Sequence, residues 1–158
     1  MLNSNMFTLT IEDNFLSKDY CTFLMNYIEE NQNVACEFSS RTVLNITKNI
    51  GFSELKDMLN IFARKYNSKI EWFELVKWPK GAKHDYHIDI SSSKTIFSSI
   101  IYLNDNFLGG ETVFEDFTIT PKQGRLLFFD GINNYHGVKE VISDIRYVVA
   151  AWFERLDS

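Results

Sequence analysis

The chain contains a short polar stretch, Gly81-Ala82-Lys83-His84-Asp85-Tyr86-His87-Ile88-Asp89. In an extended segment, residues two apart project from the same face, so His87 and Asp89 aim an imidazole and a carboxylate at a common point. His84 precedes His87 by an odd spacing, which predicts that it faces away, toward the surface. A later histidine, His136, completes a set of two imidazoles and one carboxylate. This set is typical of non-haem Fe(II) sites that keep open coordination positions.

Arg146 lies in an apolar segment, Ile145 to Phe153, that has the alternation of a strand. The alternation places Arg146 and Trp152 on the same face, with two small apolar residues between them. A buried guanidinium is costly without a partner, and the carboxylate of a ligand would supply one. A structural ion pair with Asp144 or Glu140 is the alternative for this arginine.

Further motifs occur in a fixed order between Phe73 and Phe153. They are Trp78-Pro79-Lys80-Gly81, Tyr102-Leu103-Asn104, Gly109-Gly110-Glu111-Thr112 and Pro121-Lys122-Gln123-Gly124. A lone His-x-Asp pair is a weak signal, because a single histidine is more often a structural residue than a ligand. The ordered set, with its spacings kept, resembles the prolyl 4-hydroxylase branch of the Fe(II)/2-oxoglutarate-dependent dioxygenases over about half of the chain.

This resemblance implies three ligands for iron and a separate site for the cosubstrate. Fe(II) would be held by His87, Asp89 and His136. The distal carboxylate of 2-oxoglutarate would be bound by Arg146, with help from Tyr102, Thr112 and Trp78. Dioxygen is then the second substrate, and ascorbate is the expected reductant.

Two positions depart from the family pattern. Trp78 stands where the family usually has tyrosine, and Thr95 stands where many members have an arginine near the substrate channel. The resemblance also makes Trp152 a candidate wall for the substrate and Arg41 a candidate contact at its entrance. The structural alternatives are a place in the core for Trp152 and a solvated surface position for Arg41.

Composition and charge limit the classes of protein. The 158 residues, 45% of them hydrophobic and 15% aromatic, predict one domain, 1–158, with a packed core. A formal net charge of −5 disfavours nonspecific binding to nucleic acids or anionic membranes. No apolar run has the length of a membrane helix, and the first residues lack the order of a signal peptide. We therefore expect a monomeric cytoplasmic protein whose cysteines, Cys21 and Cys36, are reduced and buried.

Hydrophobic periodicity separates a helical first part from a β-rich remainder. Ser17 is predicted to cap a helix from Lys18 to Glu30, and Ser53 to open a second helix whose buried face extends to Tyr66. From Lys69 onward, short strands alternate with turns, as in sandwiches and closed barrels. The predicted fold class is mainly β with packing helices (α+β). The resemblance sharpens this to a double-stranded β-helix, or jelly roll, with two N-terminal helices on its outside.

The functional prediction is an Fe(II)- and 2-oxoglutarate-dependent dioxygenase, in the first place a prolyl 4-hydroxylase. Its substrate would be a peptide or protein, with proline-rich sequences as candidates. One alternative is a hydroxylase of another amino acid or of a small molecule, because Thr95 removes a feature of the substrate side. Another is a non-catalytic jelly-roll binding module that keeps a metal for stability. Nucleic-acid demethylases of the superfamily are disfavoured, because their second arginine is replaced here by Trp152.

Overall fold

The computed structural model describes residues 7–90 and 92–157. Residues 1–6, on which the targeting prediction relied, lie outside this part of the chain. The larger sheet has the strand order β1-β10-β6-β13-β4-β3-β2, and every pairing in it is antiparallel. Its strands are β1 (Leu9–Glu12), β2 (Cys36–Phe38), β3 (Arg41–Asn45), β4 (Ser68–Trp78), β6 (Phe97–Tyr102), β10 (Leu126–Phe129) and β13 (Arg146–Arg155).

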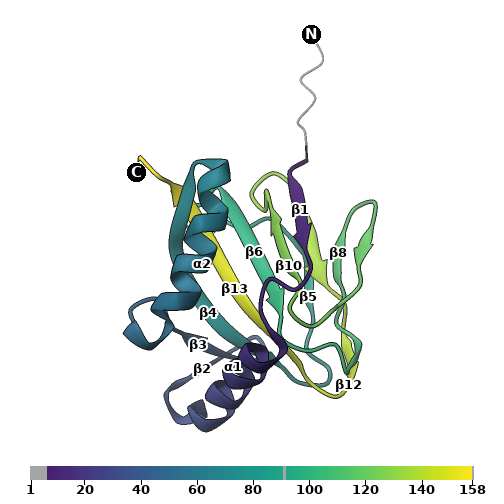
Figure 1. Ribbon diagram of the computed structural model, residues 1–158. Helices are drawn as coiled ribbons and strands as arrows, with labels where there is room; N and C mark the ends of the chain where they lie inside the picture. The colour runs from purple at the N-terminus through teal and green to yellow at the C-terminus, as the bar shows by residue number, and fades with distance from the viewer. Residues whose placement is uncertain (1–6, 91, 158) are drawn as a thin grey trace.

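A smaller antiparallel sheet faces the larger one and has the order β5-β11-β8-β9. In Figure 1 its strands β5 and β8 lie beside β10, on the side away from the helices. Its members are β5 (His84–His87), β8 (Thr112–Phe114), β9 (Thr118–Ile119) and β11 (His136–Val138); a separate pair joins β7 (Leu108–Gly109) to β12 (Val141–Ser143). Two facing antiparallel sheets with helices on the outside confirm the predicted jelly roll.

The large sheet is buried on both faces, and β10 shows how. Leu126 and Phe128 pack into the core beneath the helices, whereas Leu127 and Phe129 pack into the core between the two sheets. Successive side chains of a strand point to opposite faces, so a strand between two cores must be apolar at every position. This explains why the sequence there is a continuous apolar run.

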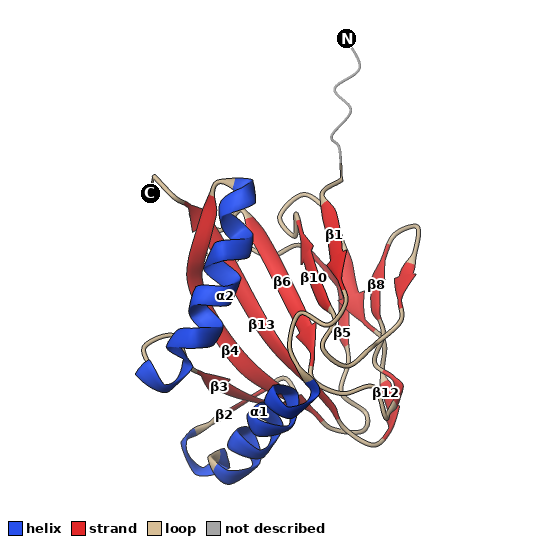
Figure 2. Cartoon of the chain, viewed as in Figure 1, coloured by secondary structure: helices blue, strands red, loops and turns tan. Residues whose placement is uncertain are grey.

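Two helices cover the outer face of the large sheet, as Figures 1 and 2 show. The first, α1 (Lys18–Glu30), has the predicted bounds and the predicted cap, since the Ser17 hydroxyl accepts a hydrogen bond from the Tyr20 amide at 3.1 Å. Its buried stripe contains Leu24 and Ile28, whereas Phe23 is 49% exposed. Phe23 lies just beyond the edge of the stripe and stacks on Tyr20 instead.

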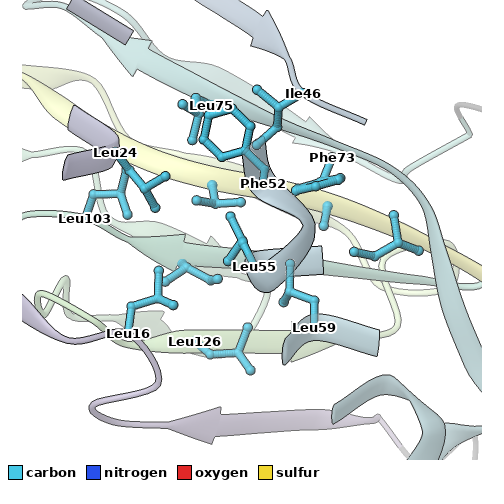
Figure 3. Close-up of a cluster of buried hydrophobic side chains, with 14 of the residues drawn as sticks. Leu16, Leu24, Ile46, Phe52, Leu55, Leu59, Phe73, Leu75, Leu103 and Leu126 are labelled. Atoms are coloured by element: carbon cyan, nitrogen blue, oxygen red, sulfur yellow. The ribbon is translucent and has the colours of Figure 1, made fainter. Parts of the chain in front are cut away.

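The second helix, α2 (Ser53–Ala63), continues into a 3-10 turn, Arg64–Tyr66. Figure 3 shows its residues Leu55 and Leu59 directed into the apolar cluster that joins it to the sheet. Three-ten turns also flank the other ends of the helices, at Gln32–Val34 and Ile50–Phe52.

The contribution of this cluster can be tested within α2. Leu59 is fully buried, whereas Ile61 on the same helix is 63% exposed. We expect Leu59→Ala to lower the free energy of unfolding by about 2–5 kcal/mol, because it leaves a cavity that the packed core cannot fill. Ile61→Ala should change it by less than about 0.5 kcal/mol. Urea denaturation of both variants measures the difference, and equal effects would contradict this packing.

Ser39 and Ser40 have φ values of 48° and 66° and form the tight turn between β2 and β3, whereas Arg41 and Thr42 belong to β3. One local prediction is wrong. Cys36 was expected to be buried, but it is exposed on the edge strand β2, whereas Cys21 is buried; both are free thiols. None of the helices in the described part of the chain is long and apolar enough to cross a membrane.

Candidate active site

The structure brings His87, Asp89 and His136 together between the two sheets. His87 at the end of β5 pairs in register with His136 at the start of β11. The Nε2 atom of His87 lies 3.3 Å from Oδ1 of Asp89, and that of His136 lies 3.3 Å from Oδ2. All candidate ligand atoms lie within 4.8 Å of one another. Two imidazoles and a carboxylate at this separation fit a single divalent cation.

Backbone carbonyls orient both imidazoles. Nδ1 of His87 lies 2.8 Å from the carbonyl oxygen of Asp85, and Nδ1 of His136 lies 2.9 Å from that of Asn134. A carbonyl can only accept, so each Nδ1 carries a proton, and each Nε2 faces the common point, where the neutral imidazole offers its lone pair to a cation. The sequence could not identify these acceptors.

The electrostatics of the cluster favour an ionised carboxylate. Burial alone would raise the pKa of Asp89, but in the metal-free protein the imidazoles of His136 and His87, when protonated, donate hydrogen bonds to the carboxylate and hold its pKa well below the usual range. Burial alone would lower the pKa of His87, but its hydrogen bond to Asp89 raises it overall. With both imidazoles neutral, the three groups carry one negative charge, which a cation would neutralise.

Arg146 is fully buried at the start of β13. Its Nη2 donates to Thr112 Oγ1 at 3.3 Å, and the hydroxyl of Tyr102 lies 2.5 Å from the same oxygen. Its Nε and Nη1 atoms have no hydrogen-bond partner, and no carboxylate of the described residues lies within ion-pair distance. The ion pair with Asp144 or Glu140 is therefore wrong, and both of these acids are exposed.

The surroundings of Arg146 fit a ligand carboxylate. Its guanidinium lies 4.7 Å from the Trp78 ring, whose buried indole N–H also lacks a partner. Trp78 and Thr112 line the same cavity as the histidines, and Arg146, which does not line it, contacts both. A buried guanidinium with two free donors is costly, and a carboxylate would satisfy it. The site thus has the polar partners that the distal carboxylate of 2-oxoglutarate requires.

The two candidate substrate residues both line the cavity. Trp152 stacks on Trp72 with ring centroids 4.9 Å apart, and its indole N–H has no partner. Arg41 is only 8% exposed and lies 4.5 Å from the Trp78 ring, so its interpretation as a solvated surface residue is wrong. The burial follows from its position next to the β2–β3 turn, which folds Arg41 over Trp78. Thr95 does not line the cavity, and its hydroxyl donates to Glu71 at 2.8 Å.

Two titratable residues of the cavity were not predicted as site residues, and the first is His84. Its ring stacks on that of His87 at 3.7 Å, so the expectation that it faces away is wrong. The register explains this, because three steps from His84 to His87 oppose only two steps from Val138 to His136. Such a bulge returns two residues of odd spacing to the same face. Burial lowers the pKa of His84 to about 4.

Glu74 is the second site residue that was not predicted from the sequence. A single acidic residue at an inward-facing position of an otherwise apolar strand could have indicated it. It lines the cavity opposite Ala150, on β4. Burial raises the pKa of Glu74 to about 7, against the weaker opposing effect of Arg41.

This raised pKa predicts a pH-dependent stability. Between the usual value of 4.5 and about 7, the unfolded chain loses a proton that folded Glu74 keeps. The free energy of unfolding therefore falls as the pH rises through this window. Glu74→Gln should remove about 2–3 kcal/mol of that fall, because the amide does not titrate. Urea denaturation of both proteins at pH 4.5 and 7.5, in a metal chelator, measures the difference; parallel profiles would contradict it.

The fold and the site together define a class of protein, that of the non-haem iron oxygenases with a two-histidine, one-carboxylate site. The family model of the 2OG-Fe(II) oxygenase superfamily matches residues 73–154, just over half of the chain. The chain belongs to the 2OG-Fe(II) oxygenase superfamily, which confirms the predicted family. Membership implies the use of Fe(II), 2-oxoglutarate and dioxygen.

Curated relatives are similar over a limited region. The chain is 42% identical to prolyl 3-hydroxylase 2 of Homo sapiens and 40% identical to that of Gallus gallus, in both cases over 65 residues. The matched region is 36% of this chain but only 9% of each relative. The chain therefore spans a small part of these proteins, and their activity as whole proteins does not transfer directly.

Solved structures resemble the chain over nearly its whole length. A prolyl hydroxylase from Trichoplax adhaerens, in complex with a hypoxia inducible factor peptide, has a TM-score of 0.77 at 18% identity and covers 97% of this chain and 86% of its own. A prolyl-4-hydroxylase from Pseudomonas putida has a TM-score of 0.75 at 17% identity, with 95% and 94% covered. At this identity the likeness establishes the fold, which is the one predicted.

Proposed function

We propose that this chain is a prolyl hydroxylase that uses Fe(II) and 2-oxoglutarate to hydroxylate prolyl residues of a peptide or protein, in the first place at carbon 4. The observation that carries this proposal is the convergence of three metal-binding side chains beside a buried arginine with two free donors. The fold supports it, because the matching structures include prolyl hydroxylases.

In this proposal, His87, Asp89 and His136 hold the iron. Arg146 binds the distal carboxylate of 2-oxoglutarate, assisted by Tyr102, Thr112 and Trp78. When bound, iron and 2-oxoglutarate supply the oxidative chemistry, in which one atom of dioxygen enters a C–H bond and the other enters succinate as CO2 is released.

The chain itself positions the substrate and excludes water. Trp152, backed by Trp72, forms an apolar wall of the cavity near the three ligands, and we assign it to the prolyl ring. Arg41 lines the same cavity and offers donors to a peptide carbonyl. The half-buried, stacked indoles of Trp72 and Trp152 keep this part of the site apolar.

A second position of hydroxylation has specific support. The curated relatives are prolyl 3-hydroxylases, so carbon 3 of proline is the competing target atom. Purified protein incubated with Fe(II), ascorbate and 2-oxoglutarate, with and without proline-rich peptides, tests the proposal. Succinate formation and a peptide mass increased by one oxygen atom are expected. Chromatography of the hydrolysed peptide then separates 3- from 4-hydroxyproline.

The other outcomes of this assay are informative. Succinate formation that no peptide stimulates would favour a small-molecule substrate. If the protein showed neither turnover nor metal-dependent binding of 2-oxoglutarate, the alternative of a non-catalytic jelly-roll binding module would be favoured.

Three accompanying features belong to the same proposal. Ascorbate keeps the iron reduced, the chain acts as a monomer, and it works in a reducing compartment such as the cytoplasm. The two free cysteines are consistent with the last of these. Omission of ascorbate, light scattering of the purified protein and localisation of a tagged chain test them separately.

A further inference from the structure

Ser98 contacts the carboxylate of Asp89 from the opposite sheet. Its hydroxyl donates to Oδ2 of Asp89 at 2.5 Å. Ser98 belongs to β6 of the large sheet and is only 3% exposed, whereas Asp89 follows β5 of the small sheet. This hydrogen bond therefore joins the two layers at the candidate metal site.

Gly131 also lies next to the Asp89 carboxylate and the Ser98 hydroxyl. Its carbonyl accepts a hydrogen bond from the Asp89 amide at 2.8 Å. A Cβ atom at this position would lie 2.7 Å from Asp89 Oδ2 and 2.7 Å from Ser98 Oγ. Side-chain atoms do not approach a Cβ so closely, so only glycine leaves room for the carboxylate and the hydroxyl together.

The two oxygens of Asp89 consequently have different surroundings. Oδ2 faces Ser98, Gly131 and His136, whereas Oδ1 has His87 as its polar neighbour. A carboxylate oxygen that already accepts a short hydrogen bond is the weaker ligand of the two, and its partner fixes the rotation of the group.

We infer that Ser98 is a positioning residue for the metal site. Its hydrogen bond rotates the Asp89 carboxylate so that only Oδ1 binds the cation, and the absence of a side chain at Gly131 leaves room for this contact. The inference rests on the proposed function, because it assigns Asp89 as a metal ligand. Two residues on the same face of β6 then have separate roles. Ser98 contacts the Asp89 carboxylate at the candidate metal site, and Tyr102 contacts Thr112, the hydrogen-bond partner of Arg146.

Metal affinity in the absence of 2-oxoglutarate and dioxygen tests this role. Loss of a residue that orients a ligand typically costs 10–100-fold in metal affinity. We expect Ser98→Ala to weaken Mn(II) binding, followed by electron paramagnetic resonance, by about 10–100-fold. Ser98→Thr keeps the hydroxyl and should restore affinity to within a few-fold of the wild type. Gly131→Ala should weaken binding like Ser98→Ala, because its methyl group displaces the carboxylate.

Ser99→Ala is the matched control. Ser99 is 1% exposed on the same strand, and its hydroxyl has no hydrogen-bond partner among the described residues. Its loss removes the same atom from the same sheet and should leave Mn(II) affinity unchanged. If Ser98 had a merely structural role, Ser98→Ala would lower the Tm without changing the absorption spectrum of bound Co(II). The positioning role predicts a changed Co(II) spectrum, since the carboxylate becomes free to bind through both oxygens.

The results separate this inference from the proposed function. Equal Mn(II) affinities and Co(II) spectra for Ser98→Ala, Ser99→Ala and the wild type, with hydroxylation intact, would overturn the positioning role alone. Failure of the wild type to bind Mn(II) or Co(II) would overturn the proposed function and this role with it.

Discussion

Replacement of His136 by alanine is expected to abolish metal binding and hydroxylation together. His136 is 6% exposed, and its Nε2 atom lies 3.3 Å from the Asp89 carboxylate. Loss of a residue that only orients a ligand costs about 10–100-fold in affinity, so loss of a ligand itself should cost more than about 100-fold. Saturating Mn(II) should raise the Tm of the wild type, because a ligand that binds only the folded state stabilises it, and this rise should vanish in the variant.

Two further variants separate ligation from packing. His136→Gln keeps most of the side-chain volume and should lose the metal-induced rise in Tm as alanine does. His84→Gln removes the histidine that stacks on His87 but is not in the group of converging ligand atoms, and it should retain the rise. A metal-induced rise that persists in His136→Ala would mean that the ligands are wrongly assigned.

Replacement of Arg146 should weaken 2-oxoglutarate binding and leave the metal in place. Truncating one partner of a buried, hydrogen-bonded charge pair costs about 2–5 kcal/mol, which corresponds to about 30-fold to several thousand-fold in affinity. We expect losses in this range for Arg146→Ala and Arg146→Met, measured by calorimetric titration of the Mn(II)-loaded protein with 2-oxoglutarate. Arg146→Lys should lie between, because it keeps the charge and loses the planar fork.

The ligand-free protein supplies an independent measurement. Burial lowers the pKa of Arg146, as expected for a charge that is held without an acidic partner. Arg146→Met replaces this charge by an apolar chain of similar length, so the Tm without ligand should stay level or rise. A large fall in Tm would indicate that Arg146 has a structural role. Loss of metal from Arg146→Ala equal to that from His136→Ala would also contradict the division of roles.

Local features were predictable because their causes are local. The cap and bounds of α1 follow from Ser17 and from a stripe at helical spacing. The inner face of β13 follows from strand alternation, which places Arg146 and Trp152 on one side. The three candidate metal ligands, which the structure brings together, followed from residue types and order along the chain.

Features that depend on pairing between distant segments were not predictable. His84 was assigned to the wrong face because the bulge opposite β11 exists only once β5 and β11 pair. Arg41 was read as a surface residue because its burial depends on the contact with Trp78, far away in the chain.

The sequence by itself determined the candidate groups for the chemistry, namely two imidazoles, one carboxylate and one guanidinium, because the residue types define what each group can bind. Only the tertiary structure decided how these groups are held. The carbonyls of Asp85 and Asn134, the hydroxyl of Ser98 and the space at Gly131 act through distances of 3 Å or less. The contacts of Ser98 and Gly131 with Asp89 join segments that are distant in the sequence, and they arise from the packing of the two sheets against each other. The carbonyls of Asp85 and Asn134 lie only two residues before their histidines, so these two contacts depend on the local backbone conformation, which the residue types do not specify.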